Sequence, residues 1–101
     1  MNQEKNNYYV YVYIDPRNFK EFYYGKGQGK RKDEHERDTR DSKKTEIIKA
    51  IKKEGLRPII RVIASNLSEE QAFLIESTLI WKLRGSLTNK VAGHFKEHFR
   101  P

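Results

Sequence analysis

The segment from residue 8 to residue 31 contains residue types that can bind phosphate. Tyrosines alternate with β-branched residues from Tyr8 to Ile14, and a second aromatic run covers Phe22–Tyr24. Gly25–Arg31 follows and is rich in glycine and positive charge. Aromatic and cationic side chains beside exposed backbone can form a surface that handles phosphate groups. Strand tyrosines also commonly serve only to pack a core, so the composition leaves both roles open.

Two residues at the start of the charged segment Lys30–Lys44 have a spacing that would let their side chains act at the same site. Arg31 and His35 are four residues apart, which places them on one face if the segment is helical. The planar guanidinium of Arg31 can offer two donors to phosphate oxygens and stabilise the negative charge gained in a transition state. Most of the other residues in this segment are expected to form a solvated helix face or a loop.

Glu76 is a carboxylate in the middle of an apolar helix face. At 3.6 residues per turn, its neighbours on that face form one stripe, made of Ala72, Phe73, Ile75, Leu79, Ile80 and Leu83. A carboxylate there should be desolvated, which raises its pKa and requires a compensating partner. The helix alone leaves two roles equally open, a structural bond to an arginine or tyrosine and a bond to a metal ion.

An α+β fold is expected to position these residues, with a small three-stranded antiparallel sheet flanked by helices. Aromatic and β-branched runs predict strands at Tyr8–Ile14, Phe22–Tyr24 and Pro58–Ala64. Asp15–Asn18 has the residue types of a turn between the first two strands. The glycine-rich run is expected to leave the sheet as flexible backbone.

Three helical segments complete the predicted order β-β-α-α-β-α. The first lies in the charged segment, the second is Ser42–Glu54, and the third runs from about Glu69 to Leu83. Ser68 and Gln71 have the spacing of a capping box, which makes the start of the third helix well defined.

The length and composition indicate one domain without a membrane span. The 101 residues fit a domain at residues 8–93, between a flexible N-terminus at 1–7 and a tail at 94–101. No window approaches ~18 consecutive apolar residues, and residues 1–7 lack the apolar core of a signal peptide. The absence of cysteine excludes disulfides and thiolate metal sites. These features favour a cytoplasmic protein, and a monomer is favoured over an oligomer.

The charge balance favours a polyanionic partner. The formal net charge is +7, and such a small basic domain suits a nucleic acid, although charge alone hardly separates it from a merely basic protein. The glycine-rich run lacks the Gly-Lys-Ser/Thr ending of a P-loop and the spacing of a dinucleotide motif. The sequence therefore argues against a nucleotide-binding loop.

Two tripeptides of the predicted hairpin, Tyr9-Val10-Tyr11 and Tyr23-Tyr24-Gly25, precede a run Gly25-Lys26-Gly27-x-Gly29-x-Arg31-x-x-x-His35. Glu76 and Asn89 follow later in the chain. This order resembles the signature of the GIY-YIG nuclease superfamily, and the glycine-rich continuation is similar to its LEM-3-like branch. The resemblance covers residue 8 to about residue 93. Tyr9 departs from the superfamily pattern, because it stands in the place of the first glycine.

The resemblance implies an endonuclease that depends on Mg²⁺ or Mn²⁺ and hydrolyses DNA phosphodiester bonds with one metal ion. It implies catalytic roles for six residues: Tyr11, Tyr23, Arg31, His35, Glu76 and Asn89. Glu76 is the implied metal ligand. A lone carboxylate suits one Mg²⁺ that keeps several waters, whereas a two-metal site needs a cluster of acids. DNA is expected to contact Lys26, Lys30 and Arg31.

Tyr11 is expected to act as general base or to orient the attacking water, with His35 sharing the proton transfer. As a base, Tyr11 needs a pKa well below ~10, and nearby cations such as Lys26, or the metal-bound water network, could lower it. Tyr23 would help to hold water or phosphate. Asn89 would bind backbone or phosphate and fix the geometry, although asparagine after a helix is more commonly a turn residue.

Two other functions stay open at this point. One is a basic nucleic-acid-binding module that has lost catalysis. The other is a structural interaction domain, which would leave the joint occurrence of the tyrosines, Arg31, His35 and Glu76 unexplained.

Overall fold

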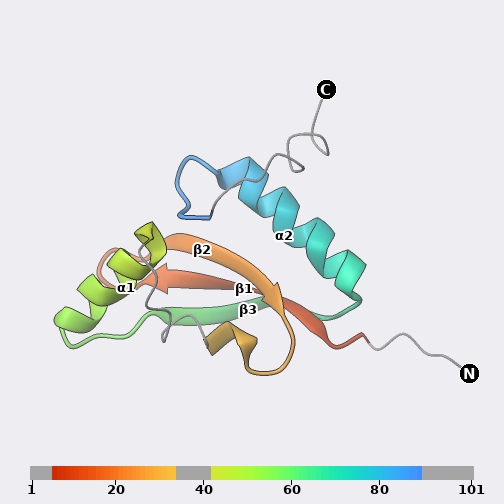
Figure 1. Ribbon diagram of the computed structural model, residues 1–101, viewed down its shortest axis with the longest axis horizontal. Helices are drawn as coiled ribbons and strands as arrows, with labels where there is room; N and C mark the ends of the chain where they lie inside the picture. Colours follow the sequence, from red (N-terminus) through yellow and green to blue (C-terminus); the bar gives the residue numbers. More distant parts are fainter. Residues whose placement is uncertain (1–5, 34–41, 90–101) are drawn as a thin grey trace, which may run out of the picture.

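A three-stranded antiparallel sheet and two α-helices make up the computed structural model, which describes residues 6–33 and 42–89 (Figure 1). The strands are β1 (Tyr8–Asp15), β2 (Lys20–Gly27) and β3 (Ile59–Leu67), and β1 lies in the middle of the sheet. The helices are α1 (Lys43–Lys53) and α2 (Glu69–Leu83). The predicted α+β class and the antiparallel sheet are confirmed.

The predicted element between β2 and Ser42 is represented by a 3₁₀ turn at residues 31–33. Residues 34–41, which include His35, lie outside the described residues. No helix in the described ranges 6–33 and 42–89 is long and apolar enough to cross a membrane.

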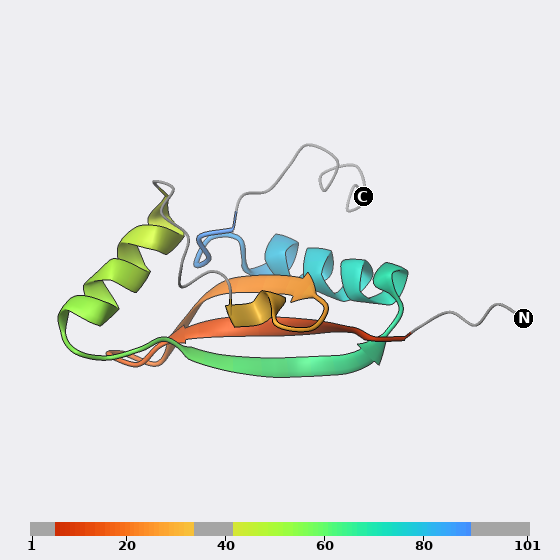
Figure 2. The ribbon, with the colours of Figure 1, turned by 60° about the horizontal axis from the view of Figure 1, so that its bottom comes forward.

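Strand β1 is buried on both faces, and its alternating residues pack in two different clusters. Tyr9, Tyr11 and Tyr13 share one face, which we call the tyrosine face, and their rings form a core cluster with Phe22 of β2 and with apolar residues of α1, Ile48 and Ile51. Val12 lies on the opposite face and packs with Tyr24 of β2 and Ile80 of α2. Figure 2 shows α1 at the hairpin end of the sheet and α2 alongside the strands.

Side-chain caps define where both helices begin. The Ser42 hydroxyl accepts a hydrogen bond from the backbone N–H of Thr45 at 3.2 Å, which starts α1 one residue after the expected position. Ser68 and Gln71 form the predicted capping box of α2, with reciprocal bonds of 3.1 and 2.9 Å. The connection from the end of β3 to the start of α2 is therefore fixed by hydrogen bonds.

The glycine-rich run does not leave the sheet where the sequence analysis expected. Gly25 and Gly27 both belong to β2, where they pair with Tyr11 and Tyr9 of β1 and are buried. The prediction of flexible backbone at these two positions is wrong. The reason is that a Cβ atom would meet the Tyr11 ring at Gly25 and the Arg31 side chain at Gly27, so their small size serves packing and not freedom of the backbone.

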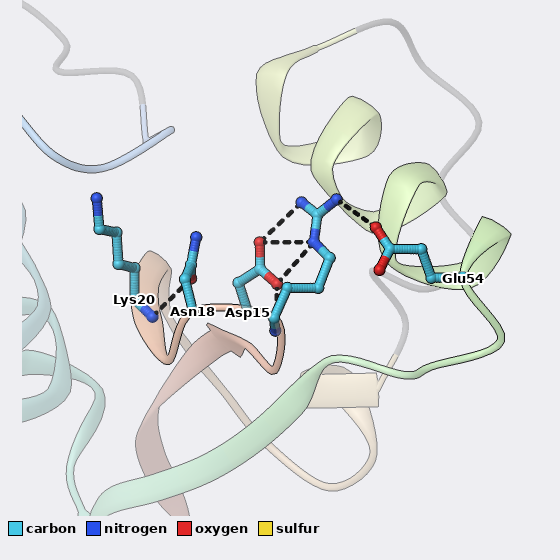
Figure 3. A network of polar contacts seen from close by, with 5 residues as sticks. Asp15, Asn18, Lys20 and Glu54 are labelled. Carbon is cyan, nitrogen blue, oxygen red and sulfur yellow. Dashed lines mark hydrogen bonds and ion pairs between the residues drawn. The ribbon is translucent and has the colours of Figure 1, made fainter.

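The turn between β1 and β2 is fastened to α1 by a buried carboxylate (Figure 3). Asp15 is 4% exposed and accepts hydrogen bonds from the backbone N–H of Arg17 at 2.9 Å and from its guanidinium at 2.8 Å. The same guanidinium donates to Glu54, at the end of α1, at 3.2 Å. These bonds lower the pKa of Asp15, chiefly through the side chain of Arg17.

We expect Asp15→Asn to lower the melting temperature by several degrees at pH 7. A lowered pKa in the folded state stabilises the fold above the ordinary value of 3.8, and this stabilisation is lost as the pH falls through that range. The gap between wild type and variant should therefore close in acid. Thermal melts across pH measure it, with Glu54→Gln as the control, because Glu54 is 55% exposed and surface ion pairs contribute little. A gap that is the same at every pH would contradict this assignment.

Candidate active site

A cleft of about 500 Å³ opens at the β2 edge of the sheet. It is lined from three directions by Tyr8 and Tyr11 of β1, by residues 23 and 25–28 in and after β2, by Arg31, and by Glu69 and Glu76 of α2. Four of the six predicted catalytic residues therefore meet in one place: Tyr11, Tyr23, Arg31 and Glu76. Lys26, predicted to bind DNA, lines the same cleft, whereas Lys30 is exposed outside it.

Gly25 allows Tyr11 to reach this cleft from the middle strand. Tyr11 is 1% exposed, and its ring passes over the backbone of Gly25, its partner in β2. A Cβ atom at residue 25 would lie under 3.0 Å from three atoms of the Tyr11 ring and hydroxyl. Because Gly25 has no side chain, the Tyr11 ring can cross the backbone of β2, and its hydroxyl reaches the edge of the sheet.

Gly27 makes room for Arg31 in a similar way. A Cβ atom at residue 27 would lie 2.8 Å from the Cβ and 2.9 Å from the Cγ of Arg31. The turn that carries Arg31 begins with a hydrogen bond from its own N–H to the carbonyl of Gln28 at 3.1 Å. The aliphatic stem of Arg31 is thus laid against the end of β2.

The resemblance implies cleavage of DNA with Tyr11 as a catalytic group, and on that expectation Gly25→Ala should reduce cleavage by more than about 100-fold, because displacement of such a group by about 1 Å can cost that much. Single-turnover cleavage assays measure the loss. Gly85→Ala is the matched control, since a Cβ at residue 85 would meet no atom within 4 Å. Equal rates for the two variants would show that the position of the Tyr11 ring does not matter.

Lys26 crosses the mouth of the cleft. Its ammonium lies 3.6 Å from a carboxylate oxygen of Glu69 and 5.6 Å from the centre of the Tyr8 ring. Sequence reasoning missed Glu69 and Tyr8 as cleft residues. The available signal was the spacing of Glu69 and Glu76, seven residues apart on one helix face.

Asn89 does not line the cleft. It forms hydrogen bonds with the backbone of β2, at a residue whose side chain is also outside the cleft. Its side-chain amide accepts from the backbone N–H of Tyr24 at 2.9 Å and donates to the carbonyl of Tyr24 at 2.6 Å. Thr88 adds bonds from its N–H and its hydroxyl to the carbonyl of Phe22, at 2.8 and 2.7 Å. Of the two roles expected for Asn89, binding backbone and binding phosphate, the contacts fit the first.

The sequence model of the LEM-3-like GIY-YIG domain matches residues 8–100 of this chain. The chain belongs to this family. No curated protein and no solved structure matches it. The resemblance read from the hairpin tripeptides is confirmed, and all the residues that line the cleft lie inside the match. Membership places the chain in a family of nucleases.

Burial decides the protonation of Tyr11 in this GIY-YIG domain. The pKa of Tyr11 is raised, first by burial and then by its neighbours Tyr23 and Tyr13, while the charge of Arg31 opposes the rise only partly. A nearby cation, Arg31, does lower this pKa, but desolvation outweighs it and the net shift is upward. Tyr11 therefore keeps its proton at neutral pH and enters the cleft as a hydrogen-bond donor.

Glu76 behaves as the sequence analysis expected of a carboxylate on an apolar helix face. Burial raises its pKa, and the positive charges of Lys26 and Arg31 lower it. Its carboxylate also accepts a hydrogen bond from the backbone N–H of Lys26. Glu76 is thus attached to the edge of β2 through a backbone group, while two cations compensate its charge from the cleft side.

The donor set at Glu76 fits a hard divalent cation. No group of three or more His, Cys, Asp and Glu residues that could hold a metal occurs in residues 6–33 and 42–89. A single carboxylate at an open cleft suits Mg²⁺ or Mn²⁺, which take oxygen ligands, and Mg²⁺ usually keeps several waters.

Proposed function

We propose that this GIY-YIG domain is a divalent-metal-dependent endonuclease that hydrolyses DNA phosphodiester bonds. The main support is the convergence of Tyr11, Arg31 and Glu76, from β1, the turn after β2 and α2, on one cleft. A neutral donor, a cation and a half-buried carboxylate are the groups that a phosphodiester needs for orientation, charge stabilisation and metal binding.

Each residue has a distinct proposed role. Glu76 would hold Mg²⁺ or Mn²⁺, and the ion, when bound, supplies charge stabilisation at the phosphate. Arg31 donates to non-bridging phosphate oxygens through its planar fork. The protonated Tyr11 hydroxyl positions the attacking water or a phosphate oxygen, and Tyr23, whose ring centre lies 6.4 Å from that of Tyr11, supports it.

Because Tyr11 keeps its proton, the group that accepts the proton of the water is sought elsewhere. His35 is our candidate for this step, on the basis of its place in the family pattern and the ordinary pKa of histidine near neutrality. Asn89 acts by holding the backbone of Tyr24, next to the glycine over which Tyr11 passes.

Cleavage of supercoiled plasmid tests the proposal. Wild-type protein is incubated with plasmid and Mg²⁺, Mn²⁺ or EDTA, and nicked and linear products are followed over time. We expect products with either ion and none in EDTA. Tight DNA binding without cleavage in any condition would instead support a nucleic-acid-binding module without catalysis.

Binding should also depend steeply on salt. Each phosphate contact contributes roughly 0.9 to the slope of log affinity against log salt concentration, so Lys26→Gln should reduce that slope by about one contact. Fluorescence anisotropy with labelled duplex DNA at several salt concentrations measures it. Lys49→Gln serves as control, since Lys49 is exposed on α1 and no residue of α1 lines the cleft. A flat salt response of the wild type would favour an interaction domain.

A further inference from the structure

Two tyrosine hydroxyls hold the backbone on either side of Arg31. The Tyr9 hydroxyl donates to the carbonyl of Gly29 at 2.6 Å and accepts from the backbone N–H of Lys32 at 3.0 Å. The Tyr13 hydroxyl donates to the carbonyl of Lys32. The turn is therefore bonded to the sheet both before and after Arg31.

The anchors of these bonds are rigid. Tyr9 is 9% exposed and Tyr13 is fully buried at 0%, and both rings belong to the core cluster of the tyrosine face. Tyr11 lies between them, with ring centres 5.9 Å from Tyr9 and 6.0 Å from Tyr13. The turn is thus bonded to the two rings that flank the tyrosine of the cleft.

The turn needs such anchors, because its own side chains are largely in solvent. Lys30 and Arg31 are exposed, and Gly29, which adopts a positive φ of 57°, lacks the Cβ that would limit its backbone to fewer conformations. An arginine on an untethered turn would sample many positions, whereas charge stabilisation requires donors already in place. The hydroxyls of Tyr9 and Tyr13 add a restraint from the sheet to the backbone bonds within the turn and to the packing of the Arg31 stem against Gly27.

We propose that Tyr9 and Tyr13 are positioning residues, which fix the turn of residues 29–32 on the tyrosine face and thereby place the Arg31 guanidinium beside Tyr11 and Glu76. The catalytic part of this inference rests on the proposed nuclease function. Tyr9 stands where the superfamily pattern has glycine, which has no hydroxyl, so the restraint through Tyr9 accompanies a departure of the chain from that pattern.

Hydroxyl deletions test the proposal while the rings stay in the core. We expect Tyr9→Phe together with Tyr13→Phe to slow single-turnover plasmid cleavage by about 10- to 100-fold, with three hydrogen bonds lost, and to change DNA affinity by less than about threefold. Tyr24→Phe is the matched control. It also loses one hydroxyl from the same sheet, a bond of 2.7 Å to Glu21, but it lies on the opposite face and does not touch the turn.

Coupling to Arg31 separates positioning from a general effect on the fold. In an Arg31→Ala background the two tyrosine substitutions should slow cleavage by less than about twofold further, because their effect passes through Arg31. A full additional loss in that background, or an equal loss in Tyr24→Phe, would overturn the positioning role.

Amide hydrogen exchange provides a readout that does not depend on cleavage. Exchange of the Lys32 amide should be at least about tenfold faster in Tyr9→Phe than in wild type and unchanged in Tyr24→Phe. Unchanged exchange in Tyr9→Phe would refute the restraint itself. A wild type that cleaves no plasmid with either ion would overturn the nuclease proposal, and faster Lys32 exchange would then still support the restraint of the turn.

Discussion

Glu76→Gln should reduce metal-dependent DNA cleavage by about 1,000-fold. The charge stabilisation that a metal ion provides is worth several kcal/mol, and each 1.4 kcal/mol corresponds to tenfold in rate. Single-turnover cleavage with saturating Mg²⁺ measures the loss. Glu69→Gln is the control within the same cleft, since Glu69 is exposed and already faces Lys26. Unimpaired nicking by Glu76→Gln would remove this residue from the metal site.

The same variant should be more stable than the wild type in EDTA at neutral pH. Burial raises the pKa of Glu76, so its ionised form destabilises the fold above that pKa, and the deficit disappears as the pH falls toward the ordinary value of 4.5. Glutamine removes the charge and keeps an oxygen for the backbone N–H of Lys26. Glu76→Leu should melt below Glu76→Gln, because it leaves that N–H without its acceptor. A lower melting temperature for Glu76→Gln, with activity retained, would mean that the carboxylate is a structural link.

Arg31→Lys should slow cleavage by about 100-fold and leave DNA affinity within a few-fold of wild type. Lysine keeps the charge but loses the planar fork that holds two phosphate oxygens at once, and removal of one such preorganised donor costs about 100- to 1,000-fold in rate. Single-turnover rates and anisotropy titrations separate the two effects. Lys49→Gln is the control, since Lys49 is an exposed cation on α1 and no residue of α1 lines the cleft. Weak binding with a normal cleavage rate would assign Arg31 to DNA capture alone.

Local patterns in the sequence were sufficient to predict the helices and strands and to single out Glu76 as a candidate site residue. The alternation in β1, the Ser68–Gln71 capping box and the placement of Glu76 in an apolar stripe each depend on residues a few positions apart. The structure confirms all three in the arrangement that the patterns indicated. The resemblance to the superfamily, and not a local pattern, assigned Tyr11 and Tyr23 to one site, and both line the cleft.

Features that depend on tertiary contacts were outside the reach of such patterns. The register that sets Gly25 under the Tyr11 ring comes from strand pairing, and it reversed the interpretation of the glycines as flexible. The raised pKa of Tyr11 depends on how deeply the sheet buries it. The bonds of Asn89 to Tyr24 join residues 65 positions apart, so the sequence carried no local sign of them.

The contacts along the outer side of β2 also bear on aggregation. β2 is an edge strand, and unpaired N–H and C=O groups on such a strand recruit strands from other molecules. Here Thr88, Asn89 and Glu76 take up outward-facing backbone groups of Phe22, Tyr24 and Lys26 in turn, every second residue along the strand. These three residues occupy backbone groups with which a strand of another molecule would otherwise pair. They therefore oppose edge-to-edge association of two domains along β2, at the side of the sheet where the cleft opens.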